Sequence, residues 1–168
     1  AELRKHRSEH WGSINYGQYL PANLEKKHRY YSYKGGKDII NVFANEKFNI
    51  SNRVNLLAEA QLSYNNYMLY DEKYVGYDFE VNHLFFNPRV GLNYKFSPAL
   101  SSYVSFARVN REPRLKTYYD AAESSGGETP QFERNAGGSY NFDEPLVSPE
   151  TMNDVELGFH YSKPNYNV

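Results

Sequence analysis

Two alternating segments joined at Ser97-Pro98, within residues 87–115, constrain the fold more than any other feature. In the second segment, polar or small side chains at 101, 103, 105 and 107 alternate with Leu100, Ser102, Val104 and Phe106, and the first segment alternates in the same way through Val90, Leu92, Tyr94 and Phe96. A period of two places successive side chains on opposite faces of an extended strand. The pattern therefore predicts a β-hairpin, and an apolar face opposite small polar groups is typical of strands between lipid and water.

The cleanest alternation in the chain runs from Val54 to Tyr64, where apolar residues at even positions oppose mostly polar residues at odd positions. Leu, Ala, Glu and Gln are good helix formers, so residues 56–62 also fit a helix. The unbroken alternation favours a strand. Further strands are predicted at 10–19 and 155–161, and in two pieces of 30–48 that Gly35-Gly36 separates by a bend or bulge. The total is about six strands.

The connections predicted between these strands are of two kinds. Residues 47–51 and 95–99 play the same role, because each closes a strand before a polar turn, and the two turns lie 48 residues apart. Ser162-Lys163-Pro164 is predicted to form another short turn. Long loops are predicted at 65–83 and at 111–154, the second rich in glycine and proline. Short turns at one end and long loops at the other are typical of outer-membrane barrels.

Composition excludes several classes of protein. The 168 residues include 17 tyrosines and 10 phenylalanines, with a mean hydropathy of −0.79 and a net charge of −1. No apolar run approaches the ~20 residues of a spanning helix. The near-neutral charge argues against a nucleic-acid partner, and the basic runs at 4–7 and 26–29 are expected in loops or on the inside of a barrel. The absence of cysteine excludes disulfides and thiol chemistry, and the charged residues 1–10 are not expected to be a signal peptide.

No catalytic, cofactor or metal site is predicted. The sequence holds no phosphate loop, HExxH motif or nucleophile elbow. The carboxylates of 111–154 show no spacing that would converge two of them. Only His6 and His10 are near neighbours among the histidines, and their four-residue spacing would align them on a helix, which the surrounding residues do not favour. The chain is therefore not expected to be an enzyme.

Two ordered stretches covering about 70 residues resemble the barrel region of TonB-dependent outer-membrane receptors. The first passes from a strand ending at Tyr94-Lys95-Phe96, through the Ser97-Pro98 turn and a strand rich in Ser, Tyr and Phe, to Arg111-Glu112-Pro113. The second, at 146–159, is similar to the family's L-x-P-E approach followed by E-L-G-aromatic. The positions that carry the resemblance are Asn87, Pro88, Arg89, Phe96, Pro98, Arg111, Pro113, Pro149, Glu150, Glu156, Leu157 and Gly158.

The resemblance implies an all-β fold, an antiparallel transmembrane β-barrel segment belonging to a barrel of about 22 strands. Single-chain bacterial barrels start at about 8 strands, each of about 9–11 residues. Six strands cannot close such a barrel. We therefore expect residues 1–168 to be a partial receptor barrel, with the plug domain outside this chain.

The implied function is TonB-dependent transport across the Gram-negative outer membrane. The ligand would be scarce, such as an iron–siderophore complex, haem, cobalamin or a glycan. It would bind extracellular loops and the plug, on which an inner-membrane energy-coupling protein of the TonB type acts. The residues predicted to bind the ligand are Arg111, Arg114, Tyr118 and Tyr119. Expected partners are outer-membrane lipid, the small ligand and the TonB-type protein, with no nucleic acid and no cofactor.

Tyrosines allow two interpretations. The cluster at Tyr30, Tyr31 and Tyr33 could contact a ligand, whereas strand-end tyrosines such as Tyr64, Tyr94, Tyr103 and Tyr161 are predicted to form an aromatic girdle or pack in the lumen.

Two alternative folds remain open from the sequence alone. One is a soluble β-sandwich that binds glycans through exposed aromatic rings, with the apolar parity turned into a shared core. The other is a small non-receptor outer-membrane barrel. Detergent dependence of the folded protein would separate the sandwich from the barrels.

Overall fold

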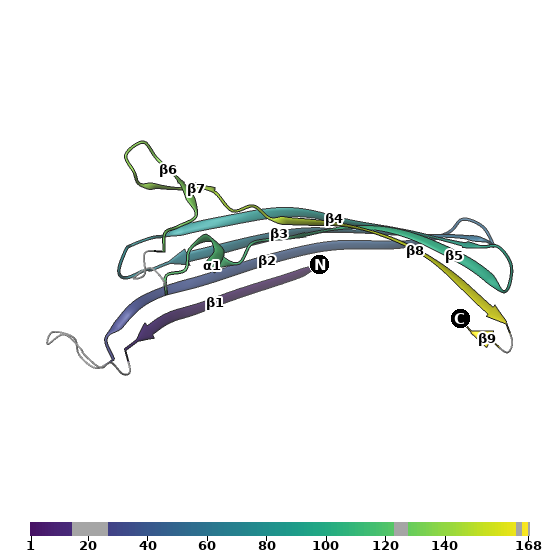
Figure 1. Cartoon of the computed structure of the whole chain (residues 1–168), viewed down its shortest axis with the longest axis horizontal. Helices are drawn as coiled ribbons and strands as arrows, with labels where there is room; N and C mark the ends of the chain where they lie inside the picture. Colours follow the sequence, from purple (N-terminus) through teal and green to yellow (C-terminus); the bar gives the residue numbers. More distant parts are fainter. Residues whose placement is uncertain (15–26, 123–127, 164–165, 168) are drawn as a thin grey trace.

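A computed structural model describes residues 1–14, 27–122, 128–163 and 166–167. Its main feature is one long antiparallel sheet that curls along its width (Figure 1). The strand order is β1-β2-β3-β4-β5-β8-β9, so neighbours in sequence are neighbours in space apart from the β5–β8 connection. The strands are β1 (Glu2–Ser13), β2 (Arg29–Asn49), β3 (Val54–Tyr70), β4 (Phe79–Lys95), β5 (Leu100–Arg111), β8 (Glu150–Lys163) and the short β9 (Tyr166–Asn167).

A small second unit fills the β5–β8 connection. It contains one helical turn, α1 (Leu115–Tyr118), and a two-stranded sheet of β6 (Phe132–Arg134) and β7 (Tyr140–Pro145). The predicted loop at 111–154 is therefore partly wrong, because it contains these elements and β8 begins at Glu150 instead of Val155. No helix among the described residues is long and apolar enough to cross a membrane.

The predicted hairpin and the predicted strand at 54–64 are confirmed. Val90 pairs with Phe106 and Leu92 with Val104 across β4 and β5, so their apolar side chains share a face. Each strand is longer than its alternating pattern. The loop predicted at 65–83 shrinks to residues 71–78, because Asn65 and Asn66 continue the β3–β4 ladder as far as Leu69 opposite Phe79.

The prediction of two strand pieces separated at Gly35-Gly36 by a bend or bulge is wrong. β2 is continuous, and both glycines pair in register with β1 and β3. A Cβ atom on Gly36 would come 2.9 Å from the end of the Met68 side chain and 3.2 Å from the Arg7 side chain. Glycine inside a strand marks either a bulge or a site of close approach. Here it allows the neighbouring side chains of Met68 and Arg7 to approach the backbone.

The N-terminal strand lies earlier than predicted. β1 covers Glu2–Ser13, whereas the predicted strand at 10–19 continues into 15–26, which lie outside the described residues. The basic residues Arg4, Lys5 and Arg7 are thus in a strand and not in a loop. Register with β2 places Arg4 on the same face as His6 and Lys37, and Lys5 and Arg7 on the opposite face.

The repeated turns are confirmed, with a shift of two residues. In each turn a serine hydroxyl accepts backbone N–H groups two and three residues later, from Arg53 and Val54 to Ser51 and from Ala99 and Leu100 to Ser97. Ser51 is therefore equivalent to Ser97, not to Ala99 as the sequence match implied. Both turns lie at one end of the sheet, and the long connections lie at the other (Figure 1).

The two faces of the sheet differ in polarity. We call outer the face formed by a continuous apolar surface whose cross-strand rows include Ile40–Tyr64–Leu84, Val42–Leu62–Phe86 and Val104–Leu157. Many of these side chains are exposed, Leu84 to 65% and Leu157 to 67%. The inner face carries Asn55, Glu59, Gln61, Asn65, Asn87, Arg89 and Asn93.

An exposed apolar face without a covering layer fits a strand surface in lipid and does not fit a sandwich. The described residues contain no second large sheet that could cover it. The predicted transmembrane β-barrel segment is confirmed, and the sandwich is not the fold of this chain.

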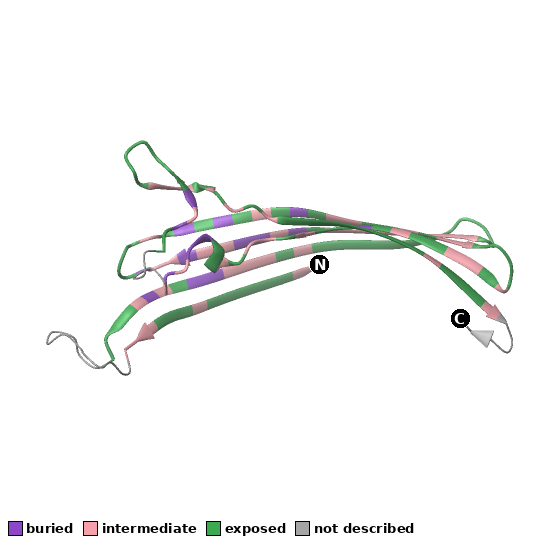
Figure 2. Ribbon diagram, in the orientation of Figure 1, coloured by how far each residue is buried: buried purple, intermediate pink, exposed green. Residues whose placement is uncertain are grey.

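Buried side chains gather at the long-loop end (Figure 2). They form a small core, here called the loop core, between α1, β6 and the long-loop ends of β3 and β4. Its members are Leu69, Phe79, Val81, Tyr118, Tyr119, Ala121 and Phe132. Because Leu69, Phe79 and Val81 share the inner face with His83 and Asn65, the β5–β8 connection folds against the inner face of the sheet.

Candidate functional site

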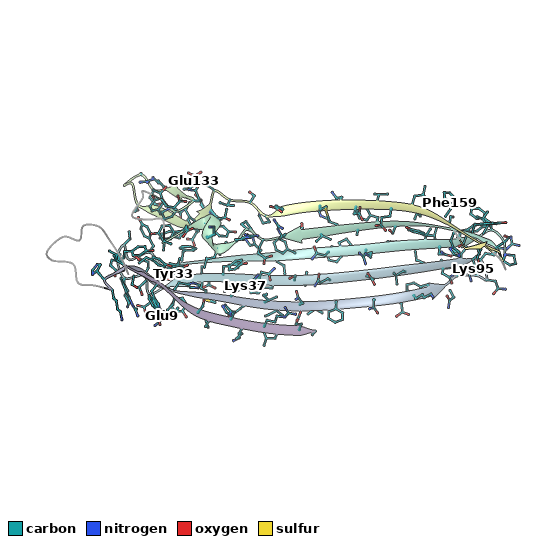
Figure 3. The ribbon with its side chains drawn as sticks, turned by 60° about the horizontal axis from the view of Figure 1, so that its bottom comes forward. Glu9, Tyr33, Lys37, Lys95, Glu133 and Phe159 are labelled. Atoms are coloured by element: carbon teal, nitrogen blue, oxygen red, sulfur yellow. The ribbon has the colours of Figure 1, made fainter. Side chains whose placement is uncertain are left out.

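The candidate site lies at the long-loop end of the inner face, where β5 gives way to the connection that leads to α1. Figure 3 shows Tyr33 and Lys37 of β2 in this half of the sheet, and Lys95 and Phe159 at the opposite end. The chain leaves β5 at Arg111 and turns inward at Glu112 and Pro113. The contacts that hold this turn therefore help to position the site.

Glu112 is the residue that fixes the turn. Its carboxylate accepts hydrogen bonds from Lys37 Nζ, from Asn65 Nδ2 at 3.4 Å and from the Tyr67 hydroxyl at 3.4 Å. Lys37 Nζ also lies 4.6 Å from the centre of the Tyr67 ring, a distance suited to a cation–π contact. These four residues, the Glu112 network, join the connection to β2 and β3.

The Glu112 network is largely shielded from water. The side chains of Lys37 and Glu112 are 25% and 15% exposed. Burial raises the pKa of the Glu112 carboxyl, but hydrogen bonds from Lys37, from its own backbone and from Tyr67 outweigh burial, so that the pKa lies below its usual value. Glu112 is therefore a carboxylate at neutral pH.

Next along the chain, α1 carries the two tyrosines into the loop core. The Tyr118 hydroxyl bonds His83 Nε2 at 2.8 Å, and the Tyr118 ring packs 5.9 Å from that of Phe132. Tyr119 packs edge-on to Tyr77 at 5.3 Å. Tyr118 and Tyr119 are 0% and 2% exposed, and burial raises the pKa of Tyr118 to about 12.

Beside this core lies a cleft of about 200 Å³, here called the arginine cleft. Arg111 and Arg114 line it together with Thr117, Ser148 and Glu150. Arg111 Nη2 lies 2.9 Å from a Glu150 carboxylate oxygen, in an exposed ion pair. Arg114 is exposed and makes no ion pair with any described residue. The cleft thus presents two guanidinium groups and two hydroxyl groups beside the carboxylates of Glu112 and Glu150, the first of which is held by Lys37 and the second by Arg111.

The four predicted site residues fall into two sets. Arg111 and Arg114 meet in the arginine cleft, whereas Tyr118 and Tyr119 lie in the loop core. The prediction that the tyrosines contact a ligand stays a prediction, and in this conformation their rings face protein. Sequence reasoning missed Glu112, Lys37 and His83, because the contacts that make them important join residues 75 and 35 positions apart.

The tyrosine cluster at 30–33 also lies at this end. The Tyr33 ring stacks on that of His10 at 4.9 Å and packs against the loop core. His10 Nε2 bonds the Ser8 hydroxyl at 2.7 Å. Among the described residues, no group of three or more His, Asp or Glu side chains is placed to hold a metal ion.

A family model for the β-barrel of TonB-dependent receptor-like proteins matches residues 3–168. The chain belongs to the TonB-dependent receptor family. A comparison with curated proteins found no match. Proteins of this family are outer-membrane receptors and transporters, not enzymes. The motif positions now have places in the structure: Asn87, Pro88 and Arg89 lie in β4, Phe96 and Pro98 at the short turn, and Glu156, Leu157 and Gly158 in β8. Arg111, Pro113 and Glu150 line the arginine cleft, and Pro149 directly precedes β8.

Proposed function

We propose that this chain forms part of the barrel wall of a receptor that takes up a scarce small ligand in a TonB-dependent manner, and that the arginine cleft binds an anionic group of that ligand. The observation that carries the proposal is the position of Arg111 and Arg114 on one cleft at the long-loop end. Guanidinium groups bind carboxylate and phosphate through paired hydrogen bonds. In this family's orientation, long loops face the exterior.

The chain would supply a partial barrel, with the plug domain outside residues 1–168. β1 pairs only with β2, so that one edge of the sheet is open in the described residues. An open sheet edge is costly in lipid because its N–H and C=O groups lack partners. Strands from the rest of the receptor would pair there. A TonB-type protein would act on the plug to release the bound ligand inward.

Among the ligand classes open to this family, the cleft favours an anionic iron chelate over an uncharged glycan. Arg114 lacks an acidic partner among the described residues, and the partner of Arg111, Glu150, is itself exposed. A ligand carboxylate or catecholate could therefore compete for both guanidinium groups. Tyr118 and Tyr119 would support the cleft by packing α1 onto the sheet. In this proposal Arg111 and Arg114 contact the ligand directly and the two tyrosines act through the backbone.

The test uses the full-length receptor with Arg111→Ala and Arg114→Ala, singly and together. The probes are iron-loaded carboxylate, catecholate and hydroxamate chelators, haem and cyanocobalamin. We expect at least one anionic probe to bind, and the double variant to bind it tenfold or more weakly. Arg134→Ala is the matched control, because Arg134 is an exposed arginine in the same connection, held by the Gly138 carbonyl and the Tyr140 hydroxyl. Unchanged affinity in the double variant would overturn the site.

A further inference from the structure

A pocket of about 550 Å³ opens on the inner face at the short-turn end of the sheet, at the opposite end from the arginine cleft. We call it the lysine pocket. Its polar lining comes from three strands and includes Lys47 of β2, Asn93 and Lys95 of β4, and Tyr103 and Ser105 of β5. Figure 3 shows Lys95 at this end of the sheet. The volume is in the range of small-ligand pockets, about 300–1,000 Å³.

The pocket exists because its floor carries almost no side chain. Gly91 lies between Leu57 and Ser105 in one inward-facing row of the sheet. A Cβ atom on Gly91 would lie 3.8 Å from the Ser105 Cβ and 3.9 Å from the Leu57 Cβ, which are ordinary contact distances that leave the space above Gly91 open. Toward β8, the Tyr103 ring lies against Gly158 and forms a wall. The result is an open floor beside a tyrosine wall.

The charge of the lysine pocket is unbalanced. Lys47 and Lys95 are exposed, and neither makes an ion pair with a described residue. Lys95 also lines the next hollow toward the turn, together with Arg53. Among the described residues, no Asp or Glu lines the lysine pocket. Glu156 lies one strand beyond Ser105, whose hydroxyl donates to it at 3.4 Å. Unpaired cations beside hydroxyl and amide groups suit a ligand with anionic oxygens.

The lysine pocket is separate from the arginine cleft but shares its face. Ser105 and Arg111 both point inward from β5. They are six residues apart, about 20 Å along a strand, so that one small ligand cannot contact both sites at once. Arg89, which also faces inward, is paired with Glu59 at 3.6 Å. The inner face therefore offers unpaired cations at each of its two ends.

We propose that the lysine pocket is a second binding site for the anionic group of the transported ligand, occupied after the ligand leaves the arginine cleft. The inference rests on the proposed function, because it takes the ligand to be an anion that binds first at the long-loop end. Short turns of such barrels face the periplasm, so the pocket lies at the end where the ligand leaves. Lys47 and Lys95 pair with carboxylate or catecholate oxygens, and Asn93 and Tyr103 supply hydrogen bonds.

The experiment counts the equivalents of iron-loaded citrate, a small polycarboxylate chelate, that bind the full-length receptor in detergent by equilibrium dialysis. We expect two equivalents. Arg111→Ala with Arg114→Ala should remove one, and Lys47→Gln with Lys95→Gln should weaken the other about tenfold, as expected for two exposed charge contacts. Lys5→Gln is the matched control, because Lys5 is an exposed cation on the outer face of the same sheet. It should leave both equivalents in place.

Two further variants separate charge from shape. Glu156→Gln removes a negative charge beside the pocket and should tighten the lysine-dependent equivalent about threefold. Gly91→Val keeps both lysines but fills the floor, and should weaken that equivalent.

The outcomes distinguish this site from the arginine cleft. Loss of the arginine-dependent equivalent alone from the expected result would refute the cleft and support the lysine pocket. Absence of a lysine-dependent equivalent, or equal effects of Lys5→Gln and the lysine double variant, would overturn the second site. A lower unfolding temperature of the lysine double variant with unchanged citrate binding would also overturn it, because the two lysines would then pair with a carboxylate of the plug.

Discussion

The Glu112 network allows the strength of one loop attachment to be predicted. Glu112→Gln keeps the size of the side chain and removes the charge that pairs with Lys37. Removing one partner of a fully buried ion pair costs about 3–5 kcal/mol, and losing an exposed pair costs about 0–1 kcal/mol. Because the two side chains are 25% and 15% exposed, we expect an intermediate cost of about 2 kcal/mol for closing the connection onto the sheet.

Hydrogen exchange of the full-length receptor measures this cost directly, since local opening exposes particular amides. The Gln131 N–H donates to the Tyr118 carbonyl at 2.7 Å, and the Leu146 N–H donates to the Gln131 carbonyl at 2.9 Å. Both bonds depend on the docked connection. A loss of about 2 kcal/mol should accelerate exchange at these two amides about 30-fold, at tenfold per 1.4 kcal/mol, while amides in the middle of β3 should not change.

Two controls separate the ion pair from a general effect of charge. Lys116→Gln removes an exposed partner of Asp120 in the same connection and should change exchange less than about threefold. Exchanging the charges, with Lys37→Glu and Glu112→Lys together, should recover part of the protection. If Glu112→Gln accelerates exchange no more than Lys116→Gln does, the Glu112 network does not hold the connection, and the reasoning fails.

Three further predictions concern the protonation of Glu112, the contact between Gly158 and Tyr103, and the two faces of the sheet. Because the pKa of Glu112 is lowered in the docked connection, its carboxylate stabilises that connection fully above the usual carboxyl pKa, near 4.3. The stabilisation should be lost as the pH falls through the lower folded-state pKa, where hydrogen exchange at Gln131 should rise. Glu112→Gln should remove that pH dependence. Gly158→Ala should destabilise the barrel by about 1–3 kcal/mol, because a Cβ atom would overlap the Tyr103 ring. Heat-dependent mobility of the full-length receptor on gels would show a lower unfolding temperature. Adding Tyr103→Ala to the same chain should restore that temperature. Leu92→Lys on the outer face should lower the free energy of unfolding by about 2 kcal/mol or more. Asn93→Lys, one residue later on the inner face, should lower it by less than half as much. Equal losses of unfolding free energy, measured by urea unfolding from lipid vesicles, would contradict the assignment of faces.

The sequence predicted the part of the fold that repeats with a period of two. Val54–Tyr64 and the hairpin around Ser97 have unbroken alternation, and the structure confirms both as strands. Alternation failed to mark the strand ends. Asn65 and Asn66 are polar because β3 and β4 continue beyond the apolar band, so polarity indicated a loop where the ladder goes on. For the same reason the sequence predicted β8 too short. Its first residues, Glu150 to Asp154, lie on the long-loop side of the apolar band and are mostly polar.

The predicted site was harder to obtain for a different physical reason. Arg111 and Arg114 could be selected from the sequence because they are cations at the point where the alternating pattern gives way to the predicted loop. Whether Tyr118 and Tyr119 are exposed depends on Phe132 and Phe79, which a linear reading does not bring near them. Glu112 was one of several carboxylates without distinctive spacing, and only the approach of Lys37, Asn65 and Tyr67 gives it a role.

The motif Asn87-Pro88-Arg89 shows how three adjacent residues can serve three separate requirements of a barrel strand. Arg89 faces inward and pairs with Glu59 at 3.6 Å, which keeps a charge on the wet side of the sheet. Pro88 faces outward into lipid, where its ring adds apolar surface, and its missing N–H ends the ladder to β5. Asn87 faces inward, and its side chain accepts hydrogen bonds from Asn110 in place of the interrupted ladder. If proline alone interrupted the ladder, replacing it would be enough to let the ladder continue. Because the Asn87 side chain also occupies the Asn110 backbone N–H, we expect Pro88→Ala to leave the interruption in place and the double change of Pro88→Ala with Asn87→Ala to let the ladder extend toward Asn110.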